Sequence, residues 1–337
     1  MIDWVKADLP LSEPLGLPHG RVMRLSPYGE VEWEAVTWHD IPNGSGDTSV
    51  RLRARSDVLE ISGNPNKWFQ GHNLWGSGDL VALTVDLALA ALRTLGARPS
   101  EPDEARWRAG GFAVRLAHVT VMFDLGSDDA VLEYLGWLEG AKAANRRVYG
   151  VRKGATVSWT SRALRMKAYH KLQELLDTRA LANHPQRDEL LAWASGKLRW
   201  EVELRSRELK RLGLDTASSW LLLGDTRKVA LAYARLVEMP TRQSPRLTLL
   251  EVPKHLRATL LLWSQGVDLR VSLPRRTYYR HRKELLAYGY DISRPPTDDE
   301  RTASLERLMC PFPPLWELPV AVSPSAGPTL SDGLKTA

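Results

Sequence analysis

The chain has 337 residues, of which 43% are hydrophobic and 8% aromatic, and its formal net charge is +6. This length favours a substantial core together with a second, smaller unit. The single cysteine, Cys310, excludes an internal disulfide framework and a CxxC-type zinc site, and it fits a reducing cytoplasm. No apolar run approaches the roughly 18–20 residues that span a bilayer, and the first residues lack the order of a signal peptide. We therefore expect a soluble, intracellular protein without membrane contact.

Residue patterns along the chain predict an α+β fold over residues 1–240, with an antiparallel sheet layered against helices. Alternation of polar and apolar residues predicts strands over residues 29–38, 50–55, 112–126 and 156–161. Apolar residues at helical spacing predict helices over residues 76–96 and 128–147. Polar positions on the alternating strands indicate that one face of this sheet contacts water.

The segment from Arg165 to Leu175 reads as a strand that runs into a helix, with Arg165, Lys167, Tyr169 and Lys171 on one face. A phenol is a poor nucleophile at its usual pKa near 10, and neighbouring cations favour the phenolate and bind a phosphodiester. The pattern therefore suits DNA strand transfer through a phosphotyrosine. The alternative is an edge strand whose tyrosine packs and whose lysines are solvated.

A second strand, over residues 197–205, precedes a helix that ends near residue 214. Period two places Leu198, Trp200, Val202 and Leu204 in the core and leaves a charged face that consists of Arg199, Glu201, Glu203 and Arg205. Carboxylate oxygens hold Mg²⁺ or Mn²⁺ beside a phosphate, and such a metal assists phosphoryl chemistry. On this interpretation Glu201 and Glu203 are metal ligands and Arg199 contacts DNA. The alternative is an exposed ladder of weak cross-strand ion pairs.

Positive charge is concentrated between Pro253 and Lys283, where eight lysines and arginines stand against Asp268, so this segment carries 8 − 1 = +7. Two helices, over residues 256–266 and 275–289, flank a break at Pro274 and predict a helix-turn-helix-like DNA-binding domain over residues 245–295. The expected DNA contacts are Arg275, Arg276, Thr277, Tyr278 and Arg280. The alternative is a helical hairpin that packs on the first domain. Residues 311–337 are rich in proline, serine and glycine and are expected to be disordered.

Four blocks of the chain, in order, resemble the gene II replication initiators of filamentous phages. They are NPNKWFQGHNLWG (64–76), AHVTVMFDLGS (117–127), TVSW with RMKAYHKLQEL (156–175), and WASGKLRWEVELRSRELKRLGL (193–214). A fifth region, residues 252–292, looks like the carboxy-terminal part of that family. The resemblance therefore spans most of the chain.

The resemblance implies a rolling-circle initiator that nicks one strand of the double-stranded replicative form and becomes attached to the 5′ phosphate. By position, Tyr169 matches the nucleophile of the family, Lys171 its neighbouring lysine, and Glu201 an acidic residue on the next strand. The implied partners are phage double-stranded and single-stranded DNA, a host polymerase and a host helicase in the bacterial cytoplasm. The chain has no Walker loop, so unwinding would come from the helicase.

One residue departs from the resemblance: His118 occupies the position of an expected acidic metal ligand. Imidazole suits Mn²⁺ better than Mg²⁺, which leaves either a nuclease with a changed metal preference or an origin-binding regulator without nuclease activity. A packed neutral histidine is a third interpretation of the residue, and an unrelated tyrosine recombinase is a further candidate for the protein. His72 in the QGHN block either contacts DNA or supports a turn.

Overall fold

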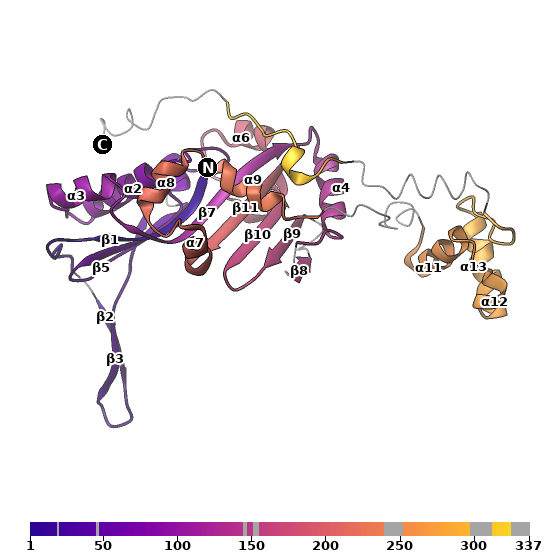
Figure 1. Ribbon diagram of the computed structural model, residues 1–337, viewed down its shortest axis with the longest axis horizontal. Helices are drawn as coiled ribbons and strands as arrows, with labels where there is room; N and C mark the ends of the chain where they lie inside the picture. Colours follow the sequence, from indigo (N-terminus) through magenta and orange to yellow (C-terminus); the bar gives the residue numbers. More distant parts are fainter. Residues whose placement is uncertain are drawn as a thin grey trace. The chain divides into compact units, whose positions relative to one another are not determined.

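The structure is a computed structural model that describes residues 1–18, 20–44, 47–143, 147–150, 155–238, 252–296 and 312–324. The chain divides into two units, which Figure 1 shows. Unit 1 contains residues 1–135, 143–236 and 315–337, and unit 2 contains residues 136–142 and 237–314. The predicted first domain ended at residue 240 and did not include the carboxy-terminal segment. Unit 1, in contrast, includes residues 315–337.

Unit 1 is built on a nine-stranded antiparallel sheet in the order β4-β5-β6-β1-β7-β11-β10-β9-β8. The strands are β1 (Ile2–Pro10), β4 (His39–Pro42), β5 (Ser49–Ala54), β6 (Val58–Gly63), β7 (Ala113–Asp124), β8 (Arg147–Gly150), β9 (Thr156–Thr160), β10 (Leu164–His170) and β11 (Lys197–Arg205). This arrangement confirms the predicted α+β class. The first strand, β1, was not predicted.

One face of the sheet is apolar and carries the core. Leu198, Trp200, Val202 and Leu204 are fully buried on it, as the alternation in β11 predicted. The Nε1 of Trp200 donates to the carbonyl oxygen of Ala230, which lies in one of the covering helices. Helices that pack against this sheet or against one another include α2 (Leu80–Thr94), α3 (Glu101–Arg108), α7 (Ser206–Leu212), α8 (Ala217–Leu223) and α9 (Arg227–Ala234).

Four further helices lie in the described part of the chain around the sheet. They are α1 (Pro65–Gln70), α4 (Asp128–Leu138), α5 (Lys171–Thr178) and α6 (Arg187–Ala194). The helix predicted over residues 128–147 was too long, because α4 ends at Leu138 and β8 begins at Arg147. Two glycines, Gly136 and Gly140, reduce the helix propensity of this segment.

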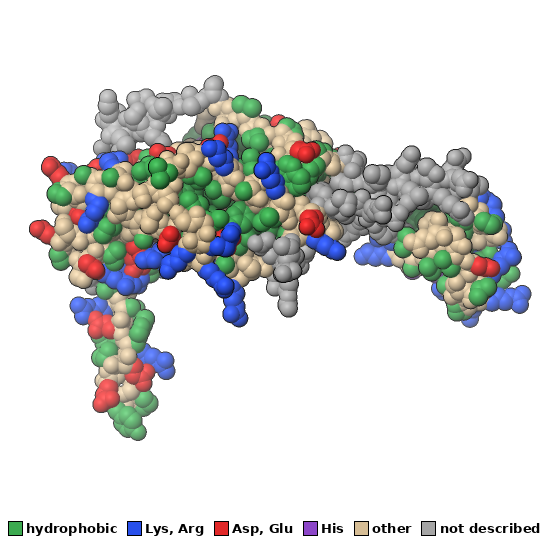
Figure 2. Space-filling view, viewed as in Figure 1, with side chains coloured by type: hydrophobic (Ala, Val, Ile, Leu, Met, Phe, Trp, Pro, Cys, Tyr) green, Lys and Arg blue, Asp and Glu red, His purple; other side chains and the backbone are tan. Residues whose placement is uncertain are grey.

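A two-stranded hairpin, β2 (Arg21–Leu25) and β3 (Val31–Val36), projects from the body of unit 1. Its strands are exposed, and Figure 2 shows hydrophobic and charged side chains mixed along it. The predicted strand over residues 29–38 therefore forms one half of this arm and not an internal strand of the main sheet. Among the described residues, no helix is both long enough and apolar enough to cross a membrane.

Unit 2 contains α11 (Lys254–Ser264), α12 (Leu269–Ser272) and α13 (Arg275–Leu286). The short α12 fills the interval that the sequence predicted as a break. The three helices share a core that consists of Val252, Leu256, Leu260, Trp263, Leu269, Tyr278, Leu285 and Ile292.

The segment over residues 312–324 differs from the disordered tail predicted from its composition. It contains a short 3₁₀ helix, Leu315–Glu317, in which Leu315 is fully buried. It then pairs with the end of β7, where Ala321 donates its N–H to the carbonyl oxygen of Met122. Backbone pairing and a few apolar anchors thus order a proline-rich segment. Residues 325–337 lie outside the described residues.

Candidate functional site

Tyr169 lies near the end of β10, directly opposite Arg199 of β11, and only 3% of it is exposed. Two lysines lie close to its ring: the Nζ of Lys167 is 3.9 Å and the Nζ of Lys171 is 5.9 Å from the ring centroid. The Tyr169 hydroxyl donates to Oε2 of Glu201 at 3.4 Å. The structure therefore brings Tyr169 together with Lys167, Lys171 and Glu201, the four residues on which the sequence argument depended.

The protonation state of Tyr169 differs from the sequence-based expectation. Neighbouring cations were expected to favour the phenolate, but burial raises the pKa of Tyr169 well above 10 and outweighs the opposing effect of Arg199. The carboxylates of Glu201 and Glu174 raise it further. The free protein therefore holds a neutral phenol at this position.

Lys171 is the first residue of α5 and is 1% exposed, so it is not the solvated cation that the alternative interpretation required. Its Nζ donates to Oε2 of Glu174 at 2.6 Å and to Oδ1 of Asn73 at 3.0 Å. Burial lowers the pKa of Lys171, and the charge of Glu174 opposes that shift only in part. The ammonium is held by these two oxygens beside the tyrosine ring.

Arg199 is completely buried and works as a structural cation, whereas the sequence argument expected it to contact DNA. Its Nη1 donates to the carbonyl oxygen of Asn73. Its Nη2 lies 2.8 Å from Oδ1 of Asp3, as an ion pair whose angle is too poor for a hydrogen bond. Burial lowers the pKa of Arg199, but the charges of Asp3 and Glu201 outweigh it, so Arg199 remains protonated.

Asp3 enters the site because β1 contains a bulge. The pairing of β1 with β7 shifts register between Ile2 and Trp4, which leaves Asp3 as the extra residue and turns its carboxylate inward. Its Oδ1 accepts from Nδ2 of Asn64 at 2.7 Å and from Nδ2 of Asn73 at 2.9 Å. Three donors or cations therefore fix a carboxylate that the sequence analysis did not select.

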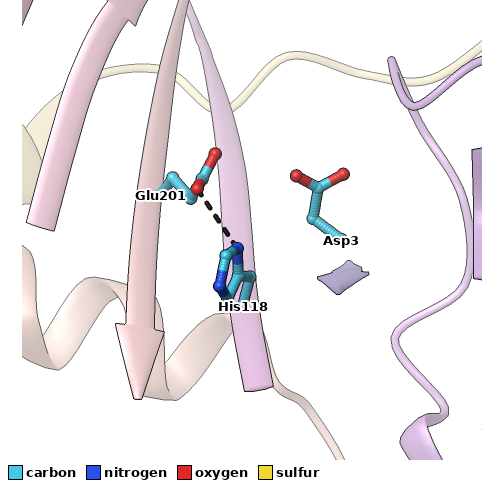
Figure 3. Close-up of side chains that lie close together, drawn as sticks. All are labelled: Asp3, His118 and Glu201. Atoms are coloured by element: carbon cyan, nitrogen blue, oxygen red, sulfur yellow. Dashed lines mark ion pairs between the residues drawn. The ribbon is translucent and has the colours of Figure 1, made fainter. Parts of the chain in front are cut away.

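Asp3, His118 and Glu201 form a cluster with the composition of a metal site. One ligand atom from each lies within 4.8 Å of the others, and Figure 3 shows the three side chains pointing toward a common region. The Nδ1 of His118 lies 3.3 Å from Oε1 of Glu201. Two carboxylates and one imidazole are a donor set that suits Mn²⁺ and also Mg²⁺.

The electrostatics of this cluster favour a charged carboxylate. Burial raises the pKa of Glu201, but the hydrogen bond from His118 and the charges of Arg199 and Lys167 outweigh it and lower the pKa to about 2. Glu201 is thus ionised at neutral pH, as a metal ligand needs to be.

Buried polar atoms without a hydrogen-bond partner gather around the same cluster. Of the seven such side-chain atoms among the described residues, four belong to this site: Nε2 of His118, Oγ1 of Thr120, and Nε and Nη2 of Arg199. Buried polar atoms are normally paired, and a concentration of unpaired ones is typical of a site that holds a ligand. The donor set, with Nε2 of His118 and Oγ1 of Thr120, fits a bound cation, whereas the two N–H groups of Arg199 suit an anion.

Two other predicted site residues lie beside the cluster. Glu203 is directly opposite His118, but its Oε2 is 3.8 Å from Nε2 of His118 and its Oε1 accepts from Nε of Arg205 at 2.6 Å. Asp3 therefore takes the third position in the cluster for which Glu203 was predicted. Arg165, opposite Glu203, is exposed, and Lys167 is half-buried. Both side chains are therefore accessible to a phosphate from solvent.

His72 supports a turn, which is one of the two roles left open by the sequence. It is 6% exposed, its Nδ1 accepts from the N–H of Leu74 at 3.4 Å, and its ring lies 4.5 Å from that of Trp75. Burial, followed by the charges of His184 and Lys171, lowers the pKa of His72 to about 4. Because the ring is buried, neutral and paired, the structure assigns it to this turn and not to DNA.

The member of the QGHN block that contacts the site is the next residue, Asn73, which sequence reasoning missed. Its two side-chain atoms and its carbonyl oxygen join Asp3, Lys171 and Arg199. A local signal existed for Asp3, because the apolar positions Ile2, Val5, Ala7 and Leu9 break their period of two at that residue. For Asn73 we find no local signal, since all its partners lie far away in the sequence.

In unit 2, the basic end of α13 is mostly available to a ligand. Arg275, Arg276 and Arg280 are exposed and Thr277 is half-buried. Tyr278, predicted as a DNA contact, is 4% exposed and packs in the core of unit 2. It lies on the buried stripe of α13 with His281 and Leu285, three and seven residues further along.

Comparison with known proteins gives consistent matches over both units. Two models of one family of phage replication-associated proteins, the gene II proteins, match the chain: the amino-terminal model matches residues 1–222 and the carboxy-terminal model matches residues 247–304. The replication-associated protein of this family from Enterobacteria phage I2-2 is 30% identical over 311 residues, which cover 87% of this chain and 88% of that protein. No solved structure matches. These matches confirm the resemblance found in the sequence, and the chain belongs to the gene II family of replication-associated proteins.

Proposed function

We propose that the protein initiates rolling-circle replication of phage DNA by nicking one strand of the double-stranded replicative form through Tyr169, and that it later rejoins the displaced strand. The observation that carries the proposal is the position of the buried Tyr169 hydroxyl, 3.4 Å from a carboxylate of the cluster formed by Asp3, His118 and Glu201. A phenol beside a site for a divalent cation and close to two lysines is suited to phosphoryl transfer.

In the proposed reaction, the phenol oxygen of Tyr169 attacks the scissile phosphorus, an O–P bond forms, and the bond from phosphorus to the 3′ oxygen breaks. The phenol proton leaves past Oε2 of Glu201, which accepts its hydrogen bond, to water, and the departing 3′ oxygen takes up a proton from water to become a hydroxyl. The energy of the phosphodiester is kept in the tyrosyl phosphate, so the reverse attack by a 3′ hydroxyl rejoins the strand.

The surrounding cations have separate roles in this proposal. Lys167 is half-buried and its ammonium lies over the Tyr169 ring. When DNA binds, this ammonium moves from the ring to a phosphate oxygen, which exposes the tyrosine. Lys171 stays buried and stabilises negative charge on the attacking oxygen. Asp3, His118 and Glu201 would hold a divalent cation, which supplies polarisation of the phosphoryl oxygen.

The test is incubation of the purified protein with supercoiled replicative-form DNA in Mg²⁺ or Mn²⁺. The expected products are open circles whose 5′ end stays attached to protein after denaturation. Tyr169→Phe removes the attacking oxygen with little change in packing, so nicking should be lost while DNA binding is retained. Nicking by Tyr169→Phe would remove Tyr169 from the mechanism, and origin binding by the wild type without open circles in either metal would favour the origin-binding regulator.

A further inference from the structure

The polar face of the sheet continues beyond the Tyr169 site onto β1, β6 and β5. Directly opposite residues of antiparallel strands share a face. The pairing of His118 with Trp4 therefore carries this face from β7 to β1. The pairings of Lys6 with Ser62 and of Ser62 with Arg51 carry it on to β5.

Three cations on this face surround one tryptophan. The ring centroid of Trp38, which lies just before β4, is 4.4 Å from Cζ of Arg53, 5.3 Å from Cζ of Arg51 and 5.7 Å from Nζ of Lys6. Trp38 itself is half-buried. We call Lys6, Trp38, Arg51 and Arg53 the Trp38 cluster.

Acidic neighbours neutralise one cation of the Trp38 cluster and leave two available. Arg53 is committed, because its Nη2 lies 2.6 Å from Oε2 of the buried Glu60. Arg51 pairs with Asp40 at 3.3 Å, but the two side chains are 52% and 62% exposed, so this ion pair is weak and easily exchanged. Lys6 has no ion pair among the described residues.

A second half-buried tryptophan lies between this cluster and the Tyr169 site. The ring of Trp4 is 6.5 Å from that of His118, and its Nε1 donates to Oγ of Ser62 at 3.1 Å. From β10 to β5 the sheet takes five strand steps, or roughly 24 Å at about 4.8 Å per step. Cations and partly open indole rings are thus spread along a path several nucleotides long.

We propose that this path binds single-stranded DNA, with bases stacking on Trp4 and Trp38 and phosphates pairing with Lys6 and Arg51. Partly open aromatic rings beside cations suit a single strand, whose bases are free to stack, whereas the bases of a duplex already stack on one another. The assignment of this strand as the one that Tyr169 cleaves rests on the proposed function. The binding itself does not depend on it.

The test measures the affinity of a fluorescent oligothymidylate for the full-length Tyr169→Phe protein by anisotropy over a range of salt concentrations. Trp38→Ala should weaken binding by about 5- to 150-fold, the effect of one lost base stack. Lys6→Ala and Arg51→Ala should each reduce the slope of log affinity against log salt by about 0.7, because one phosphate contact is lost.

Two controls separate loss of the surface from loss of the fold. Arg108→Ala removes a 47% exposed, ion-paired arginine from α3, away from this path, and should leave both affinity and salt slope unchanged. Trp38→Phe keeps an aromatic ring and should recover most of the binding lost in Trp38→Ala, at a melting temperature close to that of the parent.

Wild-type affinity in Trp38→Ala together with unchanged salt slopes in Lys6→Ala and Arg51→Ala would overturn the proposal and leave this face to a protein partner. Equal losses in Arg108→Ala would also overturn it. A wild type that binds the oligothymidylate through these residues but never nicks DNA would refute the proposed function alone, since every measurement here uses binding.

Discussion

Arg199 of β11 is buried against partners from other elements, whereas three arginines of α13 face solvent. Arg199 is fully buried and contacts Asp3 of β1 and Asn73 beyond α1, while Arg275, Arg276 and Arg280 are exposed. A buried charged side chain must keep its partners, so it is held in one conformation. Arg199 of β11 can therefore fix the positions of neighbouring site atoms closely enough for a reaction. Exposed charges provide affinity that salt weakens, with little demand on geometry. This chain therefore uses arginine in two ways, buried in β11 and exposed in α13.

The largest effect should come from breaking the buried pair. Arg199→Met removes the cation but keeps much of the volume, and it leaves Asp3 buried without its counter-charge. We expect the free energy of unfolding to fall by about 3–5 kcal/mol, as measured for buried pairs that lose one partner. Chemical denaturation of unit 1, followed by tryptophan fluorescence, measures this.

The matched substitution in α13 is Arg276→Met, because Arg276 is exposed and has no ion pair among the described residues. It should change the free energy of unfolding by less than about 0.5 kcal/mol. Similar losses in the two variants would contradict the distinction between β11 and α13.

A pH effect of nearly the same size should come from the buried His72. Its pKa in the folded protein is about 4, below the ordinary value of 6.5, so the unfolded chain binds the proton more tightly. The contribution of His72 to the free energy of unfolding should therefore be constant above pH 6.5 and fall by roughly 3 kcal/mol between pH 6.5 and pH 4. His72→Gln removes the titrating group and should flatten this part of the curve in a series of denaturation measurements.

The sequence predicted the parts of the site that are local. Alternation in β10 and β11 placed Tyr169 and Glu201 on the polar face, because a period of two is visible within a few residues and both strands keep it. Asp3 and Asn73 were missed because their roles depend on register and on a bulge, which bring together positions about 70 and 126 residues apart. Burial also raises the pKa of Tyr169, whereas the lysines were expected to lower it. The extent of burial depends on the whole fold and cannot be predicted from a local pattern.

The exposed arginines of α13 should have no effect on stability and a large effect on the salt dependence of DNA binding. Replacing Arg275, Arg276 and Arg280 by alanine removes three potential phosphate contacts and should reduce the slope of log affinity against log salt by about 2.7 for duplex DNA. Between 50 and 200 mM salt, the variant should therefore lose ~40-fold less affinity than the wild type. An unchanged slope would assign these arginines to solvent.

The smallest expected effect concerns His118, where the cluster departs from an all-carboxylate set. If His118 is a metal ligand, His118→Asp adds a hard, charged oxygen, which Mg²⁺ requires more than Mn²⁺ does. Nicking in Mg²⁺ should then rise several-fold relative to nicking in Mn²⁺. Without metal, the new carboxylate lies beside Glu201 and Glu203, so the melting temperature should fall and recover when Mg²⁺ is added. A melting temperature that falls and does not recover, with no gain of activity in Mg²⁺, would instead show that His118 is a packed histidine, because a bound ion would compensate the added negative charge.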